Sequence, residues 1–309
     1  MKLFILLIFV CSLSMAQDTK EILLLHSYNK GLKWTDGISE GVDSVMKQYP
    51  KYELTTEYMD SKRIDTQEYF DDLVKLYKQK FKSRKYEAII AADNYAYEFA
   101  LAQHENLFAD IPIVFCGVEN FDQKNIPIRL QRYVTGVVEY KVIKKNVEII
   151  KDLFPKIENL YIISDDSFSS QAIQKQILSE TKEFRKEFNI MYDNQINIDF
   201  LLEKVNKLPK NTVVLFTSLY RDMYDRYVPY HKLQNFFKLS KYPVFALNNI
   251  HLNEGIVGGI MINPFDQGSY AAQKVFEILR GKNPLQIEIS RPTAKYYFDY
   301  SVFVTIPII

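Results

Sequence analysis

The first regular pattern in the chain is an unbroken apolar run, Ile22-Leu23-Leu24-Leu25, followed by polar residues and then a helical repeat. A run without alternation is typical of a strand buried on both faces of a parallel sheet. A helix is expected to begin near Thr35 or Asp36, which are good N-cap residues. The apolar positions that follow recur at the spacing of one helix face. Residues 22–46 therefore predict the strand–loop–helix unit of an α/β sheet.

The same unit recurs along both halves of the chain. Apolar runs predict strands at 88–91, 111–116, 160–163, 190–192, 213–216, 244–247 and 256–259, and strand propensity predicts one at 52–58. Amphipathic stretches between these runs predict helices. The alternation predicts two lobes, each a mostly parallel sheet flanked by helices. In such sheets the loops at the carboxyl ends of the strands form the ligand crevice.

The two lobes are expected to be joined by more than one crossover. Lobe 1 is predicted to hold residues 17–138 and about 262–285, and lobe 2 residues 139–261 and about 286–309. A helix that Asp266 is expected to cap returns to lobe 1 and ends at Gly281, which suits an αL cap. Asp65 is expected to cap the helix that follows it. No Gly/Ser-rich segment separates the lobes, so the boundary near Glu139 is interpreted as a hinge.

The amino terminus, residues 1–16, has the pattern of a secretory signal peptide. Lys2 precedes a short apolar run, and small residues stand three and one positions before an expected cut after Ala16. The run is too short to span a bilayer as a mature helix. The residues before Cys11 lack the small side chain that a lipidation site requires, so lipidation is not expected. The mature chain is predicted to be periplasmic or otherwise extracytoplasmic.

Charge and cysteine content narrow the class of function. Cleavage removes Lys2 and takes the formal net charge from +1 to zero, so nothing indicates binding to nucleic acid or to an anionic membrane. Cys116 then remains as the one cysteine, and within an apolar run it is interpreted as a buried small hydrophobe, not a nucleophile. The chain is expected to be a monomer.

Motifs of catalysis and of cofactor binding are missing from the sequence. The four histidines stand neither in an H-E-x-x-H pattern nor beside cysteines, and there is no Walker loop, G-x-G-x-x-G or G-x-S-x-G sequence. No metal or cofactor is therefore expected. Asp165 and Asp166 form either a cation site or, as Asp more commonly does, a turn that caps the next helix. An exported hydrolase that uses either carboxylate is the alternative to a binding protein.

Polar and aromatic residues at the ends of the predicted strands are the candidate ligand contacts. Tyr28 and Trp34 either stack on a ligand ring or cover the loop. Asp93 either holds an ammonium group or caps the next helix. Arg221 either pairs with a ligand carboxylate or joins Asp222 and Asp225 in a surface ion network, and His251 is expected to be structural. The full set of candidates is Ser27, Tyr28, Trp34, Asp36, Asp93, Asn94, Tyr95, Gly117, Val118, Asp165, Ser167, Phe168, Ser218, Tyr220, Arg221, Asn248 and Asn249.

Several short segments, in this order, resemble one family over nearly the whole mature chain. They are 22–28, Lys33-Trp34-Thr35, Glu57-Tyr58-Met59-Asp60, Asp93-Asn94, 112–118, Thr135-Gly136-Val137, 255–259, 268–272, 278–281 and Phe298-Asp299-Tyr300. The chain resembles ABC-transporter substrate-binding-like proteins with a type I periplasmic-binding-protein fold. It most resembles the version that forms the extracytoplasmic input domain of bacterial sensor histidine kinases. The resemblance implies two lobes that close on a small ligand without catalysis, in a family associated with aromatic or other amino acids.

The carboxyl-terminal stretch differs from the sensor versions, which continue past the Phe-Asp-Tyr element into a membrane helix and a kinase. Here a short apolar tail interrupted by Pro307 follows that element. Two partners therefore stay open: an ABC permease, or a sensor histidine kinase whose input domain this chain would be. A structural adhesin is a further alternative. The main hypothesis is an extracytoplasmic solute-binding protein that closes on an amino acid or a similar metabolite.

Overall fold

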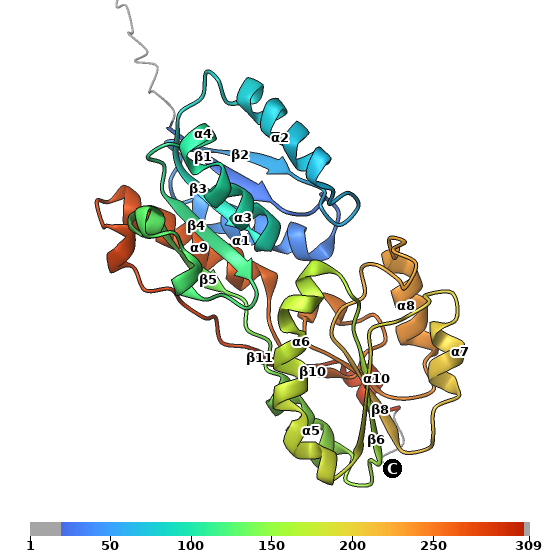
Figure 1. Ribbon diagram of the computed structural model, residues 1–309. Helices are drawn as coiled ribbons and strands as arrows, with labels where there is room; N and C mark the ends of the chain where they lie inside the picture. Colours follow the sequence, from blue (N-terminus) through green and yellow to red (C-terminus); the bar gives the residue numbers. More distant parts are fainter. Residues whose placement is uncertain (1–19, 306–309) are drawn as a thin grey trace, which may run out of the picture.

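The computed structural model describes residues 20–305, apart from the side chains of Phe168, Ser169 and Ala172, and contains two sheets in two lobes (Figure 1). The sheet of lobe 1 has the strand order β2-β1-β3-β4-β5 and is parallel throughout. Its strands are β1 (Lys20–His26), β2 (Tyr52–Tyr58), β3 (Tyr86–Ala92), β4 (Ile113–Val118) and β5 (Val134–Val138).

The sheet of lobe 2 has the order β11-β10-β9-β8-β6-β7. Its strands are β6 (Asn159–Ile163), β7 (Asn189–Asp193), β8 (Thr212–Phe216), β9 (Val244–Ala246), β10 (Gly258–Met261) and β11 (Lys295–Phe298). The pairing of β10 with β11 is antiparallel and the others are parallel. The predicted architecture of two mostly parallel sheets flanked by helices is confirmed.

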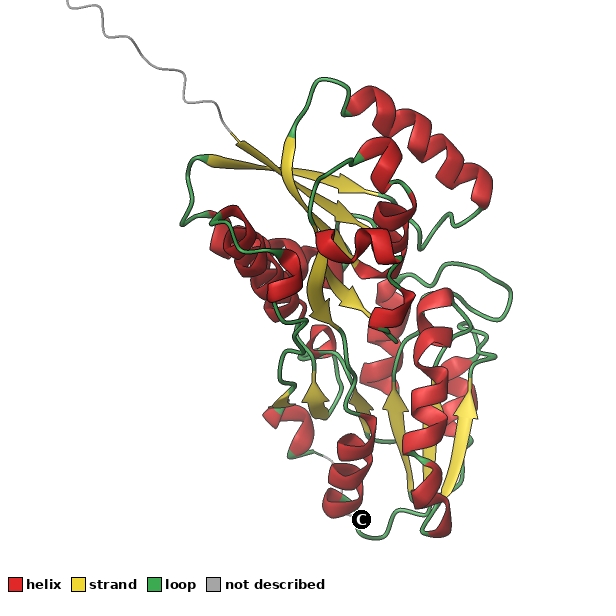
Figure 2. Cartoon of the chain, turned by 60° about the vertical axis from the view of Figure 1, so that its left-hand side comes forward, coloured by secondary structure: helices red, strands yellow, loops and turns green. Residues whose placement is uncertain are grey.

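Helices cover the faces of both sheets (Figure 2). They are α1 (Lys33–Met46), α2 (Gln67–Lys80), α3 (Asp93–Ala102), α4 (His104–Leu107), α5 (Ile143–Leu153), α6 (Phe168–Glu180), α7 (Leu201–Asn206), α8 (Tyr230–Leu239), α9 (Pro264–Leu279) and α10 (Tyr300–Phe303). Short 3₁₀ turns lie at Gln123–Asn125, Ile128–Tyr133, Lys182–Lys186, Asn249–His251 and Pro284–Gln286. Figure 2 also shows strands of lobe 2 directed toward lobe 1, so strand-end loops face the boundary between the lobes.

Burial of each sheet on both faces explains the apolar runs. In β1, Leu23 and Leu25 pack in the cluster that contains α2 and α3 residues, whereas Ile22 and Leu24 pack with residues of α1 and α9. All four side chains are fully buried. Two further clusters cover the faces of the second sheet in the same way. Cys116 is buried in β4 as expected, and burial raises the pKa of its thiol well above the ordinary value.

The helix α9 returns from lobe 2 and packs against α1 on the first sheet. A third segment between the lobes runs beside β5, where the backbone N–H of Val138 donates to the carbonyl of Ser290 at 2.8 Å. The chain therefore crosses between the sheets after β5, after β10 and before β11 (Figure 1). The residue boundaries given for the two lobes stay a prediction.

Close contact between α1 and α9 depends on glycine. A Cβ atom on Gly268 would overlap the carbonyl oxygen of Ile38, so Gly268→Ala is expected to force the helices apart. Overpacking of this kind costs about 1–3 kcal/mol of the free energy of unfolding. Urea unfolding followed by circular dichroism measures the loss. Gln273→Ala, at an exposed position of the same helix, is the matched control and should leave the midpoint unchanged.

Two helix starts differ from the sequence prediction. Thr66, and not Asp65, caps α2, because its hydroxyl accepts from the N–H of Tyr69 at 3.3 Å. Asn263, and not Asp266, caps α9 by accepting from the N–H of Phe265 at 2.9 Å. At α2 the adjacent Thr66, and at α9 the earlier Asn263, accepts from a free N–H group at the start of the helix. Asp65 instead faces lobe 2, where it pairs with Arg221.

Smaller differences concern helix limits. The helix α1 begins at Lys33, ahead of the expected start. Gly281 follows α9 with φ +97°, as expected of an αL cap. Within residues 20–305, no helix is long and apolar enough to cross a membrane. The predicted signal peptide and Cys11 lie outside the described residues.

Candidate ligand-binding site

A buried pocket lies where strand-end loops of the two lobes meet. Each strand of the first sheet supplies a side chain at or after its carboxyl end, in the order Tyr28, Lys62, Asp93, Glu119 and Glu139. The remaining lining residues are Trp34, Gly117, Lys141, Ser170, Ser218, Tyr220 and Asn248. The space open to the centre of a water molecule is about 20 Å³. That is room for about one water.

Asp93 is a buried acid of this pocket with a defined backbone conformation and a partner on α1. It begins α3 with φ +70°, and its Oδ1 accepts from the indole N–H of Trp34 at 2.7 Å. A Cβ on Gly117 would lie 2.5 Å from that Oδ1, so a glycine is needed beside it. The other carboxylate oxygen, Oδ2, is buried and has no hydrogen-bond partner. Burial raises the pKa of Asp93 to about 7, against the opposing effects of the Trp34 hydrogen bond and of Lys62 and Lys141.

Asn248 supplies a second buried acceptor without a partner. It follows β9 in lobe 2, its residue is 5% exposed, and its Oδ1 has no hydrogen-bond donor. A buried acceptor left unpaired costs about 1–3 kcal/mol. Asp93 and Asn248 therefore present, from opposite lobes, two oxygen atoms that a donor-rich group would satisfy. An ammonium group, with three N–H donors, has that chemistry.

Lys62 lies between two tyrosines that belong to different lobes. Its Nζ is 4.4 Å from the ring centroid of Tyr28 and 3.8 Å from that of Tyr220, and these two rings are 6.5 Å apart. Cations are attracted to aromatic faces at such distances. Burial lowers the pKa of Lys62 to about 8, although the charges of Asp165, Asp93 and Glu139 act to raise it.

A buried ion triad forms the hinge side of the pocket. Lys141 pairs with Glu119 and, at 2.8 Å, with Glu139, and all three side chains are about 5–6% exposed. Glu139 and Lys141 lie in the connection between β5 and α5, at the predicted hinge, while Glu119 follows β4. Burial raises the pKa of Glu139 well above its ordinary value.

An apolar pocket adjoins the charged one through two shared residues, Ser218 and Tyr220. Its other lining residues are Leu32, Lys33, Phe216, Leu219, Tyr227, Val228, Tyr230, Leu233, Ile250 and His251. His251 is buried, its Nδ1 is 3.0 Å from the hydroxyl of Tyr230, and burial lowers its pKa to about 3. The neutral imidazole agrees with the structural role expected for it.

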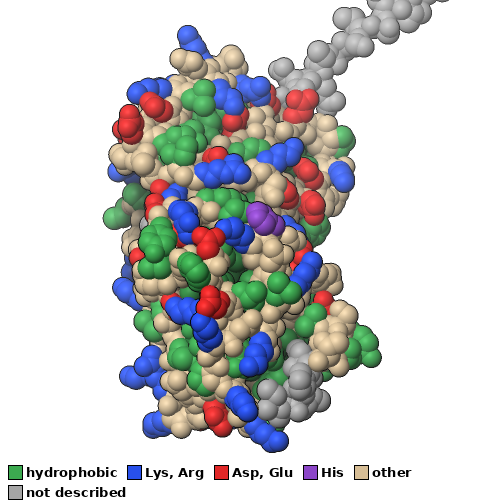
Figure 3. All heavy atoms as spheres, turned by 90° about the vertical axis from the view of Figure 1, so that its right-hand side faces the viewer, with side chains coloured by type: hydrophobic (Ala, Val, Ile, Leu, Met, Phe, Trp, Pro, Cys, Tyr) green, Lys and Arg blue, Asp and Glu red, His purple; other side chains and the backbone are tan. Residues whose placement is uncertain are grey.

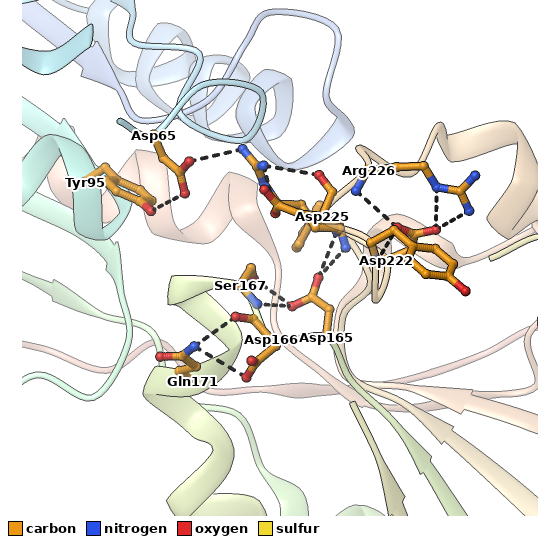
Figure 4. A network of polar contacts seen from close by, with 12 residues as sticks. Asp65, Tyr95, Asp165, Asp166, Ser167, Gln171, Asp222, Asp225 and Arg226 are labelled. Atoms are coloured by element: carbon orange, nitrogen blue, oxygen red, sulfur yellow. Dashed lines mark hydrogen bonds and ion pairs between the residues drawn. The ribbon is translucent and has the colours of Figure 1, made fainter. Parts of the chain in front are cut away.

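An ion network joins the lobes at the outer mouth of the cleft (Figure 4). Arg221 of lobe 2 pairs with Asp225 at 2.9 Å and with Asp65 of lobe 1 at 3.3 Å. Asp65 also accepts from the hydroxyl of Tyr95 at 3.2 Å. Asp222, expected beside Arg221, pairs instead with Arg226. A wider space of about 410 Å³ opens here between the lobes.

Asp165 shapes a loop, because both of its carboxylate oxygens accept hydrogen bonds from neighbouring segments. Its Oδ1 accepts from the N–H and hydroxyl of Ser167, and its Oδ2 accepts from the backbone N–H groups of Tyr220 and Arg221. Asp166 instead bonds Gln171 (Figure 4). The acidic pair therefore lies in a turn, as expected, but the N-cap of α6 is Ser167 and neither aspartate caps the helix. In the part of the chain that the structure describes, no three His, Cys, Asp or Glu residues are grouped to hold a metal ion.

Comparison with known proteins assigns the chain to a family. The family model of the ABC transporter substrate binding protein matches residues 33–298. The chain belongs to this family. No curated protein matches the chain. Substrate binding is thus the role of the family to which this protein belongs, and the lobes with a pocket between them fit that role.

Solved structures share the fold of this substrate-binding protein at low identity. An ABC domain from Streptococcus pneumonia in complex with L-Trp is 13% identical, with TM-score 0.67 over 91% of this chain and 93% of that one. A Bacillus halodurans ABC transporter solute binding protein with bound myo-inositol is 15% identical, with TM-score 0.60 over 92% and 96%. A ligand-free, open substrate binding protein with adhesive properties from Clostridium difficile is 15% identical, with TM-score 0.62 over 92% and 93%.

The pocket of this substrate-binding protein brings together part of the predicted site. The lining includes Tyr28, Trp34, Asp93, Gly117, Ser218, Tyr220 and Asn248. Ser167 and Arg221 line the outer mouth. The side chain of Phe168 lies outside the described residues.

The other candidates do not line the pocket, and most have structural partners. Ser27 bonds the backbone of Ala92 and Ala96, and Asn94 bonds both backbone groups of Glu119. Asp36 accepts from the N–H of Gly31. The rest are Val118 in the lobe 1 core, Asn249 in a 3₁₀ turn, Tyr95 beside Asp65, and Asp165 in its loop.

Five lining residues are not among the individual candidates named from the sequence: Lys62, Glu119, Glu139, Lys141 and Ser170. The signal that could have found three of them is the same strand-end rule, because Lys62, Glu119 and Glu139 follow β2, β4 and β5. Ser170 lies in the first turn of α6, where its hydroxyl is 2.6 Å from that of Ser218.

Proposed function

We propose that this protein is an extracytoplasmic solute-binding protein that closes on a small metabolite with an amino group, such as an amino acid. The observation that carries the proposal is the pair of buried, unpaired acceptors, Asp93 Oδ2 and Asn248 Oδ1, that line one pocket from opposite lobes. A ligand ammonium would bond both. Such a ligand stabilises the closed form because only that form brings both acceptors to it.

The adjoining apolar pocket supports a ligand with an apolar body. Its entrance is shared with the charged pocket through Tyr220 and Ser218, so an ammonium at Asp93 would leave the remainder of the molecule directed toward Leu219 and Leu233. Among the structural neighbours, one was solved with L-Trp and another with myo-inositol. Unpaired acceptors suited to an ammonium favour the amino acid class over the polyol.

We expect an ABC permease to bind the closed form, and the family match supports this class of partner. No catalysis is expected, because the family that the chain matches binds substrates, and the hydrogen bonds of Asp165 give it a role in shaping its loop. Wild type should therefore show no turnover of any candidate solute, and Asp165→Asn and Asp166→Asn should show no change. Hydrolysis of any candidate solute that disappears in these variants would favour the hydrolase instead.

A thermal-shift screen tests the proposed function directly. Amino acids, purine and pyrimidine compounds, organic acids and sugars are each added in excess, with the wild-type protein in every well. A ligand present at about 100 times its Kd adds about 2.7 kcal/mol to the free energy of unfolding. We expect amino acids with an apolar side chain to give the largest shift. Stabilisation by sugars or organic acids alone would contradict the ligand class, and no stabilisation by any solute would contradict solute binding.

Asp65 and Asp225 offer a matched pair of variants at the mouth of the cleft. Both pair with Arg221, but only Asp65 lies on the opposite lobe. Asp65→Asn is expected to speed dissociation of a screened ligand by up to about fivefold, the scale of a partly exposed ion pair. Asp225→Asn should leave dissociation unchanged. Stopped-flow displacement measures both rates, and equal effects would contradict a role of the Asp65 pair in closure.

A further inference from the structure

Three serine hydroxyls, those of Ser167, Ser170 and Ser218, form a row that leads from Asp165 to the charged pocket. Ser167 donates from its hydroxyl to Oδ1 of Asp165 at 2.6 Å (Figure 4). The hydroxyl oxygen of Ser170 is 3.2 Å from that of Ser167, and the hydroxyl oxygen of Ser218 is 2.6 Å from that of Ser170. Ser170 and Ser218 line the pocket and are 1% and 8% exposed. The row therefore connects a carboxylate that does not line the pocket with a hydroxyl that does.

Asp165 sets the direction of the hydrogen bonds along this row. Its oxygens also accept from backbone N–H groups, so it is an acceptor. A serine hydroxyl has one hydrogen, and the charge-assisted bond to Asp165 uses that of Ser167. Ser170 then supplies the hydrogen of its contact with Ser167, and Ser218 supplies the hydrogen of its contact with Ser170. Because its hydrogen is used in this way, Ser218 presents an oxygen lone pair to the pocket.

Ser218 is thus a third acceptor beside the two that have no partner. Asp93 and Asn248, whose Oδ2 and Oδ1 atoms are unpaired, line the same pocket, where about 20 Å³ is open to the centre of a water molecule. That space holds one group of about the size of water. A water molecule has two hydrogens to donate, whereas a primary ammonium group has three N–H donors and a positive charge. The number of acceptors therefore fits a primary ammonium group better than it fits water.

The charges of the pocket also fit one cation. Its lining contains three carboxylates and two lysines, so one formal negative charge remains. Lys141 pairs with two of these carboxylates, Glu119 and Glu139, whereas Asp93 has an unpaired oxygen. On the face of the molecule in Figure 3, acidic and basic side chains are interspersed, so that face has no broad field of either sign. The groups inside the pocket, and not that face, therefore favour a cation.

We propose that Ser218 is the third acceptor for the ligand's ammonium group, and that Asp165 positions it through Ser167 and Ser170. This inference rests on the proposed function and deepens it, because it assigns the ligand to primary amines and excludes N-methylated ones. A secondary ammonium group has two N–H donors, so it would leave one buried acceptor unpaired and place a methyl group against it. Asp165 is a positioning residue in this arrangement, since it acts on the ligand only through the hydroxyl row.

A comparison of two small amines tests the inference. Methylammonium chloride and dimethylammonium chloride are titrated at equal ionic strength, and the fluorescence of Trp34, whose indole bonds Asp93, reports binding. We expect wild type to bind methylammonium at least about tenfold more tightly, the value of one hydrogen bond to a charged group. Ser218→Ala should bring this ratio of affinities close to one. Ser44→Ala, which removes a hydroxyl bonded within α1, is the matched control and should keep the ratio of wild type.

Asp165→Asn tests the positioning role without a change to Ser218. The backbone N–H groups of Tyr220 and Arg221 require an oxygen in place of Oδ2, so the amide NH₂ of the variant faces Ser167. The hydroxyl row then reverses, and the hydrogen of Ser218 points into the pocket against the cation. We expect the methylammonium preference to fall as far as in Ser218→Ala. A purely structural role of Asp165 would lower the unfolding temperature and leave the ratio unchanged.

The contrary results are equally defined. No binding of methylammonium by wild type, equal binding of the two amines, or an unchanged ratio in Ser218→Ala overturns the inference. An unchanged ratio in folded Asp165→Asn overturns the positioning role. If Asp165→Asn does not fold, Ser170→Ala replaces it, because this variant removes the acceptor of the Ser218 hydrogen and should also lower the ratio.

Failure of this inference differs from failure of the proposed function. If an amino acid stabilises wild type and binds Ser218→Ala equally well, the role of Ser218 is wrong and the solute-binding function stands. If wild type prefers methylammonium and Ser218→Ala does not, but the screen finds no solute, the ammonium site is present and the proposed function is wrong.

Discussion

Lys141→Met is expected to lower the free energy of unfolding by about 3–5 kcal/mol, because it leaves two buried carboxylates without their cation. Lys141 is 5% exposed, and it contacts Glu119 and Glu139 in the connection between the lobes. Methionine keeps a side chain of similar length, so loss of charge and not loss of packing dominates the change. Urea unfolding at pH 7.5 measures it. Lys144→Met, three residues on in α5, removes an exposed partner of Glu183 and should leave the unfolding midpoint within error.

The size of this loss should depend on pH. Burial already raises the pKa of Glu139, and without Lys141 the native variant can relieve its charge only by binding protons. Above the ordinary carboxyl pKa, the native state then holds more protons than the unfolded chain, so the stability of Lys141→Met falls as pH rises. The gap from wild type should be smallest near pH 5 and largest near pH 8. A gap that is constant with pH would mean that packing, and not charge, is lost.

The fold could be predicted from the sequence because a strand that is buried on both faces has an unbroken run of apolar residues. The run at Ile22–Leu25 has no polar alternation, and it proved to be fully buried in β1. The end of each strand is equally visible, since polar residues follow the apolar run. Tyr28, Asp93 and Asn248, which the rule that ligands lie at these ends selects, line the pocket, and their contact with a ligand stays a prediction.

The sequence does not predict whether a side chain at a strand end points into the pocket or away from it. Asp93 and Asn94 are adjacent, yet Asp93 faces the pocket and Asn94 ties the loop after β4 in place. Asp93 has the positive φ of +70°, a backbone conformation that the residue type alone does not specify. Sequence periodicity reports burial, but it does not report the φ of a single loop residue.

Buried lysines were the harder residues to predict. Lys62 and Lys141 stand in polar loops, where charged residues are usually solvated. Their burial results from contact with groups of distant sequence position, such as Tyr220 for Lys62 and Glu119 for Lys141. Which of many loop lysines becomes enclosed is therefore fixed by how the lobes meet, a property of tertiary structure.

Asp93→Asn is expected to give the largest loss of ligand affinity. The variant keeps an Oδ1 acceptor for the indole of Trp34, and asparagine tolerates the φ of +70°. It removes the charge that would pair with a ligand ammonium, and loss of one partner of a buried charged pair costs about 2–5 kcal/mol. The Kd of an amino acid found by the screen should rise by about 30-fold or more. Isothermal titration calorimetry measures it, with Asp36→Asn, an acid outside the pocket, as the control.

The pH dependence of ligand binding by wild type tests whether the charge of Asp93 contributes to the affinity. Because the pKa of Asp93 is raised to about 7, its carboxylate is mostly protonated at pH 6, and affinity for an amine should rise with pH by up to about tenfold per unit below pH 7. Asp93→Asn should remove that slope. Stability without ligand should run the other way, falling as pH rises from about 4 to 7, because the native Asp93 holds a proton that the unfolded chain releases. Affinity that is flat between pH 6 and 7.5 in wild type would show that Asp93 does not bind the ligand as a carboxylate.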